Sequence, residues 1–106
     1  MVESGLNWLA EVVRAARQVA PSQPLGLLGT SNAAAWLAAE LQERITFFVD
    51  EDPNRVGRTF MDRPVYSPPA VPAGSHVFVA LPYLLATDIC RRLRRPDVAY
   101  HPPPAI

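Results

Sequence analysis

A short turn near position 30 combines a glycine with three polar residues. The apolar run LGLLG at 25–29 ends at Gly29, and the polar residues TSN separate it from an alanine-rich segment. Backbone N–H groups at the start of a helix bind anions and polar ligand atoms. The candidate ligand-binding residues of this turn are Gly29, Thr30, Ser31 and Asn32. The alternative is that Gly29 only permits a tight turn and Asn32 only caps the following helix.

The same turn can be compared with the glycine fingerprint of dinucleotide-binding folds. The places of its three glycines are taken here by Gly29, Ser31 and Ala34. The second glycine of the fingerprint lets a pyrophosphate approach the backbone. A side chain at Ser31 crowds that approach, although its hydroxyl could hydrogen-bond a single phosphate or a sugar. The substitution weakens the case for conventional NAD binding and favours a smaller anionic or polar ligand.

A loop rich in charged residues follows the next apolar run, ITFFV at 45–49. Its first residue, Asp50, lies about 20 residues beyond the turn, where an acidic residue holds a ribose hydroxyl in dinucleotide-binding folds. An arginine in the same loop could bind a phosphate through two parallel hydrogen bonds. The candidate ligand-binding residues of this loop are Asp50, Asp52, Arg55 and Arg58. Alternatively, Asp50 only caps the turn and the arginines are ordinary solvated charges.

The sequence shows neither a catalytic nor a metal-binding constellation. His76 opens a predicted strand and His101 lies in the predicted tail, and no serine or cysteine lies in a nucleophile-elbow pattern. Asp50, Glu51 and Asp52 are consecutive, so they cannot all converge on one cation. We therefore expect no catalytic residue and no metal in this chain.

Hydrophobic periodicity predicts the elements that position these residues. Helices are predicted at the N-terminus within 1–21, where Pro21 ends the helix, and at 33–41 and 82–94. Strands are predicted at 25–29, 45–49, 64–66, 76–81 and 98–100. Residues 101–106, with three consecutive prolines, are expected to form a flexible tail.

The order of these elements predicts the fold class. Strands joined by helices form right-handed βαβ units, and strands that are apolar almost throughout fit a parallel sheet covered on both faces. We expect a small α/β domain of Rossmann-like, three-layer design, with a mostly parallel sheet of about four to five strands and an extra N-terminal helix. The 106 residues, 49% of them hydrophobic, suffice for one core, so residues 1–106 are expected to form a single domain.

Composition limits the partners and the compartment. Ten basic and ten acidic side chains balance, so no long-range field draws the molecule to nucleic acid or to an anionic membrane. The single cysteine, Cys90, cannot form an internal disulfide, which favours a reducing compartment. Glu3 stands where a secretory leader needs positive charge, and no apolar run is long enough to span a bilayer. We expect a cytoplasmic protein that binds neither nucleic acid nor membrane.

Four segments carry a resemblance to a known family: LGTS at 28–31, FVDEDPNRVGRTF at 48–60, RPVYS at 63–67 and VFVALP at 77–82. With them, the stretch from Leu25 to about Leu93 resembles the C-terminal domain of sugar C-methyltransferases and related S-adenosylmethionine-dependent methyltransferases. The loop pattern also looks like the N-terminal domain of sugar acyltransferases that modify nucleotide-linked amino sugars. Both families are Rossmann-like.

The resemblance implies an accessory domain that is not catalytic alone. In such methyltransferases, S-adenosylmethionine and the catalytic base belong to preceding domains, while this domain helps to hold the acceptor. The chain would then position a nucleotide-sugar or similar polar acceptor through 29–32 and 50–58, bind no cofactor itself, and have a methyltransferase catalytic domain or subunit as its partner. It looks like an excised C-terminal piece or a free-standing relative.

Two other functions remain open on the sequence. One is a nucleotide-binding or NAD-binding domain of an oxidoreductase, which would need a separate substrate domain. The other is a structural or dimerising domain without a ligand, for which self-association, including a homodimer, would be the sign.

Overall fold

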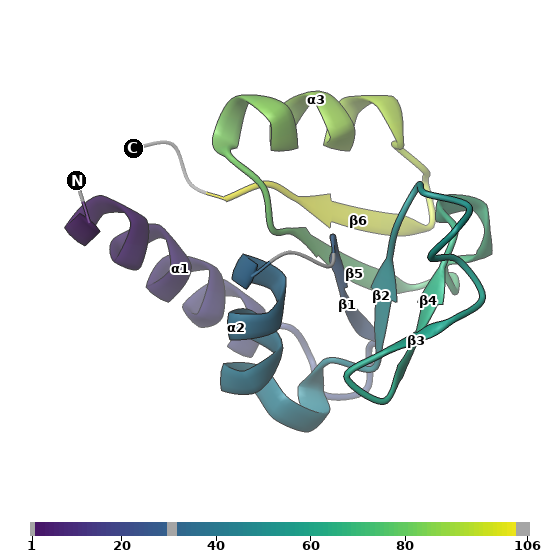
Figure 1. Cartoon of the computed structure of the whole chain (residues 1–106), viewed down its shortest axis with the longest axis horizontal. Coiled ribbons are helices and arrows are strands. Elements are labelled where there is room, and N and C mark those ends of the chain that lie inside the picture. The colour runs from purple at the N-terminus through teal and green to yellow at the C-terminus, as the bar shows by residue number, and fades with distance from the viewer. Residues whose placement is uncertain (1, 30–31, 104–106) are drawn as a thin grey trace.

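Three helices and six strands make up the part of the chain that the computed structural model describes, residues 2–29 and 32–103 (Figure 1). The helices are α1 (Val2–Arg17), α2 (Asn32–Leu41) and α3 (Tyr83–Arg92). The strands are β1 (Leu25–Leu28), β2 (Phe47–Val49), β3 (Thr59–Phe60), β4 (Arg63–Tyr66), β5 (Ser75–Val79) and β6 (Val98–His101). Short 3-10 helices occupy Gln42–Arg44 and Pro68–Ala70.

The strands form one sheet with the order β3-β4-β2-β1-β5-β6. All neighbouring pairs are parallel except β3 and β4. The predicted α/β class and the mostly parallel sheet are confirmed. The strand number is higher than expected because Thr59 and Phe60 form an additional short strand, antiparallel to β4.

A two-residue turn makes this additional strand possible. Met61 and Asp62 join β3 to β4, and both have positive φ, 50° and 63°. That pair of φ values belongs to the turn type that matches the twist of a hairpin, and its usual sequence is Asn-Gly or Asp-Gly. Because neither residue is a glycine, the sequence carried no hairpin signal here.

The path of the chain reverses beside β1. From β1 the chain proceeds to β2 and β4 on one side, then crosses to β5 and β6 on the other. The carboxyl ends of the parallel strands share one edge of the sheet, so the segments after β1, β2 and β5 meet there. The N–H of Gly29 donates to the carbonyl of Val49 at 2.9 Å, and the N–H of Ala80 donates to the carbonyl of Leu28 at 3.2 Å.

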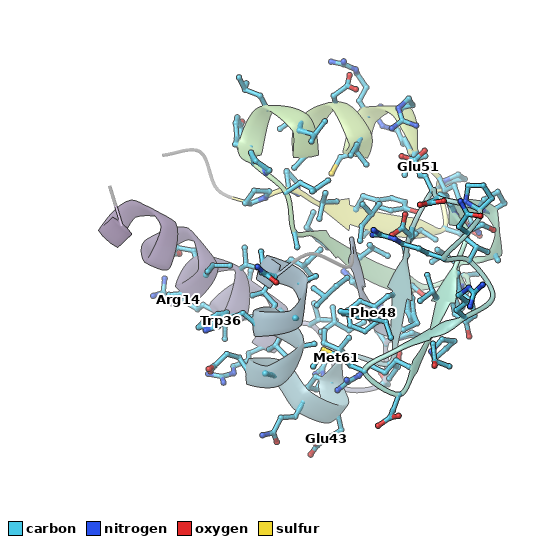
Figure 2. All side chains as sticks on the ribbon, viewed as in Figure 1. Arg14, Trp36, Glu43, Phe48, Glu51 and Met61 are labelled. Atoms are coloured by element: carbon cyan, nitrogen blue, oxygen red, sulfur yellow. The ribbon has the colours of Figure 1, made fainter. Side chains whose placement is uncertain are left out.

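Two hydrophobic clusters cover the two faces of the sheet. Helices α1 and α2 lie on one side of the sheet and α3 on the other (Figure 1). Leu25, Leu27 and Phe48 belong to the cluster under α1 and α2, whereas Phe47 and Val77 belong to the cluster under α3. Phe48 lies inside the molecule between the sheet and α2 (Figure 2). This alternation explains why the strands are apolar almost throughout.

Several boundaries differ from the sequence prediction: the strand predicted at 45–49 begins at Phe47, the strand predicted at 76–81 ends at Val79, and the helix predicted at 82–94 ends at Arg92. Two further differences have a clear physical cause. Helix α1 ends at Arg17, before Pro21, because the N–H groups of Gln18 and Val19 already close tighter turns onto the carbonyls three residues back. His101 is the last residue of β6 and not part of a tail, because it pairs with Phe78 and its ring contacts those of β5. Residues 104–106 lie outside the described part of the chain.

No helix within the described residues is long and apolar enough to cross a membrane.

Candidate functional site

The predicted turn after β1 lies at the carboxyl edge of the sheet. Gly29 has a φ of +108°, a conformation that strains any residue with a side chain, so the glycine is required there by the backbone. Asn32 is exposed and is the first residue of α2. Thr30 and Ser31, the other predicted residues of this turn, lie outside the described residues.

The loop after β2 is held by its own aspartates. The carboxylate of Asp50 accepts a hydrogen bond from the N–H of Asp52 at 2.9 Å. The carboxylate of Asp52 accepts one from the N–H of Asn54, also at 2.9 Å. Side-chain oxygens that bond to an N–H two residues on build successive turns. Asp50 therefore does cap the loop, as the alternative interpretation proposed.

Two arginines complete this loop. Arg55 places Nη1 3.4 Å from Asp50 Oδ2 and Nε 3.8 Å from Asp52 Oδ2, so one guanidinium faces both carboxylates. Arg58 donates from Nε to the carbonyl of Asn54 at 2.8 Å. Its two Nη groups make no hydrogen bond with the described residues, which leaves them able to bind an anion.

The third acidic residue of the loop points elsewhere. Glu51 lies beside the end of α3 (Figure 2), where Arg92 donates to both of its carboxylate oxygens, at 2.7 and 2.9 Å. These hydrogen bonds hold the pKa of Glu51 below its ordinary value, although burial opposes the change. The acidic side chains thus diverge, and the described residues contain no group of three side chains suited to a metal ion.

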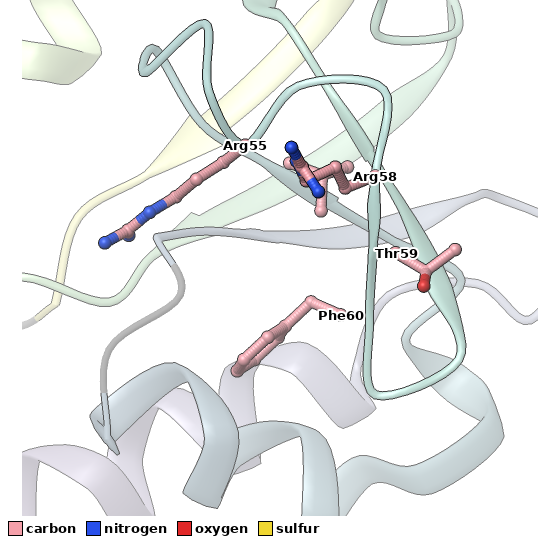
Figure 3. Close-up of a pocket in the computed structure, with 5 residues that line it drawn as sticks. Arg55, Arg58, Thr59 and Phe60 are labelled. Atoms are coloured by element: carbon pink, nitrogen blue, oxygen red, sulfur yellow. The ribbon is translucent and has the colours of Figure 1, made fainter.

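A cavity of about 270 Å³ opens beside the loop. Its walls come from Arg55, Arg58, Thr59, Phe60 and Val65 (Figure 3). The ring of Phe60 contacts that of Phe48 edge to face, with 4.9 Å between centroids, and is held against the core by this contact. The cavity therefore combines two basic residues with an apolar, aromatic wall. Such a lining suits an anionic ligand that also carries a flat or apolar part.

The structure brings part of the predicted site together. Asp50, Asp52 and Arg55 are joined by ion pairs, and Arg55 and Arg58 line one cavity. Gly29 is tied to the end of β2, one residue before Asp50. Neither Gly29 nor Asn32 lines the cavity.

Three cavity residues were missed by sequence reasoning. Thr59 and Phe60 belong to the hairpin, whose turn has no glycine to signal it, and Val65 was predicted only as part of the strand at 64–66. The one available hint was an aromatic residue directly after the loop, two positions beyond Arg58.

The two histidines, far apart in the sequence, meet on the sheet. His76 Nδ1 and His101 Nε2 lie 2.9 Å apart with nearly parallel rings, and the His101 ring also stacks on Phe78. Burial and the neighbouring His76 lower the pKa of His101 from its ordinary value of 6.5. The pair shares one hydrogen bond, which requires at least one neutral ring.

The lowered pKa of His101 predicts that the stability of the fold depends on pH. Because the pKa of His101 is lower in the folded than in the unfolded chain, the unfolded chain binds more protons below about pH 6.5. The free energy of unfolding should therefore fall as the pH is lowered from about 7 to about 5. Urea unfolding at both pH values measures this free energy. It should fall less between the two pH values for His101→Gln than for the unchanged protein. An equal fall in the variant and the unchanged protein would contradict this role.

Comparison with known proteins adds no relative: the chain matches no protein-family model, no curated protein and no solved structure.

Proposed function

We propose that this chain is a Rossmann-like accessory domain that positions a nucleotide-sugar or similar polar acceptor for a methyltransferase catalytic domain or subunit. The observation that carries the proposal is the cavity that Arg55 and Arg58 line together with Phe60. The sequence resemblance to the C-terminal domains of sugar C-methyltransferases supports the same function. A cytoplasmic location belongs to this proposal.

The strand order supports the Rossmann-like design. Numbered along the chain, the five parallel strands have the spatial order 3-2-1-4-5, with the reversal beside β1. Doubly wound folds with that order bind ligands at the carboxyl edge, where the strand order reverses. Gly29 and the Asp50–Arg58 loop both lie at this edge.

Each part of the site has a role in holding such an acceptor. The free Nη groups of Arg58 would bind phosphate oxygens, and Arg55 would add a second cation from the same wall. The ring of Phe60 offers an apolar surface to a sugar or base. Asp50 is only partly buried and could accept a hydrogen bond from a sugar hydroxyl while it caps its loop. The methyl donor would belong to the partner, whose catalytic base would act on the acceptor held here.

An NMR titration of the domain with a nucleotide-sugar tests this function. Amide shifts are expected for Gly29, Asn32 and the segment 50–60. Arg58→Ala should weaken binding by about ten-fold or more without loss of stability, because this exposed side chain holds only one loop carbonyl. Arg17→Ala, an exposed residue of α1, is the matched control and should bind normally.

Other outcomes would overturn the proposal. Stronger shifts of the same residues with NAD would favour the oxidoreductase alternative. If nucleotide-sugar, free nucleotide, NAD, acyl-CoA and S-adenosylmethionine all leave the spectrum unchanged, the result would favour a structural or dimerising domain without a ligand. Concentration-dependent association would support that alternative further.

A further inference from the structure

Strand β6 forms one edge of the sheet. It pairs with β5 on one side, and among the described residues only Arg95, in the preceding turn, bridges to it on the other. Its four residues, VAYH, carry no acidic or lysine side chain that would keep another strand away. The backbone groups of an uncovered edge can pair with an added strand.

Two cavities lie along this edge strand. A cavity of about 230 Å³ lies between β6 and α3 and includes Tyr100 in its lining, whereas a second, of about 430 Å³, includes Ala99. Val98 lines both. The lining of the second cavity comes mostly from the segments that lead into β5 and β6, so this cavity lies where the edge strand begins. A strand added along β6 would pass both cavities.

The cavity beside α3 is lined with hydrogen-bond donors. Arg94 forms no ion pair with the described residues, while Arg91 is paired with Asp88. The hydroxyl of Tyr100 is buried and has no hydrogen-bond partner among the described residues. Burial raises the pKa of this phenol, so it stays a protonated donor at neutral pH. The hydroxyl is fully covered in this structure, so the groups that a carboxylate entering the cavity can reach are the guanidinium groups of Arg91 and Arg94.

We propose that the outer edge of β6 is a docking site for an extended, acidic segment of a partner protein, which adds a strand to the sheet and places a carboxylate beside Arg94. A second copy of this chain fits less well. Antiparallel pairing of two β6 strands about a twofold axis would put both α3 helices on the same face, with their Arg91 and Arg94 side chains approaching one another. This edge is separate from the cavity at Arg58, so the proposal does not depend on the acceptor site.

A pair of blocked peptides tests the site. One has the sequence Glu-Val-Glu-Val-Glu and the other Lys-Val-Lys-Val-Lys, so they share strand propensity but differ in charge. The acidic peptide should shift the amide signals of β6 and slow their hydrogen exchange. Arg94→Glu should weaken its binding by about ten-fold. The matched control Arg17→Glu, on α1, should bind like the unchanged protein.

Three results would overturn the docking site. The first is equal binding of both peptides, and the second is the absence of any change at β6 with millimolar acidic peptide. The third is a shift of the β6 signals with protein concentration alone, which would assign the edge to self-association. None of them bears on nucleotide-sugar binding, so failure here and failure of the proposed function are distinguishable.

Discussion

Replacing Arg63 with methionine is expected to lower the free energy of unfolding by about 2–4 kcal/mol. Its guanidinium donates from Nε to the carbonyl of Ile45 at 2.7 Å, from Nη2 to that of Gln42 at 2.7 Å and from Nη1 to that of Met61 at 2.9 Å. One side chain thus fastens the β3–β4 hairpin to the segment that leads into β2. Methionine keeps much of the apolar stem but leaves these carbonyls without their donor.

Urea unfolding followed by circular dichroism measures this loss. Arg63→Lys should recover only part of it, because an ammonium group cannot match the geometry of a planar guanidinium. Arg17→Met, at an exposed position of α1, should change stability by less than about 0.5 kcal/mol. If Arg63→Met is no more damaging than Arg17→Met, the three hydrogen bonds do not stabilise the fold. The same variant should also weaken ligand binding, since Phe60 belongs to the loosened hairpin.

Gly26→Ala is expected to cost about 1–3 kcal/mol. A Cβ atom at Gly26 would lie 2.3 to 2.6 Å from three ring atoms of Phe47, its neighbour on β2. That ring is fully buried and is packed against Tyr66 as well, so it has little room to move. In a strand without such a contact, alanine is more stabilising than glycine. A loss of stability on Gly26→Ala would therefore indicate the contact with Phe47.

A double-mutant cycle isolates the contact. In a Phe47→Val background the three ring atoms are gone, so Gly26→Ala should cost much less than in the unchanged protein. Urea unfolding of the four proteins gives the interaction energy directly. An equal cost in both backgrounds would mean that the ring is not what excludes a side chain at this position.

The parts of the fold that sequence predicted are those with a repeating physical signal. The apolar runs at 25–29 and 45–49, with the alanine-rich helix between them, identified a parallel βαβ unit because burial on both faces leaves no alternation. The β3–β4 hairpin was not predicted, because Met61 and Asp62 adopt positive φ without a glycine. The order of β5 and β6 in the sheet depends on packing between residues far apart in the sequence. Local hydrophobic periodicity holds no information about that packing.

The candidate site was predictable to a similar degree. The loop 50–58 was recognised from its charges and its place after a strand, and the structure joins Asp50, Asp52 and Arg55 there. The aromatic wall at Phe60 depends on the hairpin and was missed with it. The pairing of His76 with His101 needs two neighbouring strands in register, a fact that no local pattern contains.

The ion pair between Arg92 and Glu51 joins the end of α3 to the loop after β2. Arg92 forms its ion pair with the loop that carries the candidate acceptor site. The cavity at β6 is lined by Arg91, which lies on the same helix, and by Arg94, which lies just beyond its end. A strand that docks at β6 and displaces α3 would change the ion pair between Arg92 and Glu51. Thermodynamic linkage then requires reciprocity: whatever factor the docked strand applies to the affinity for the acceptor, the acceptor applies to the affinity for the strand.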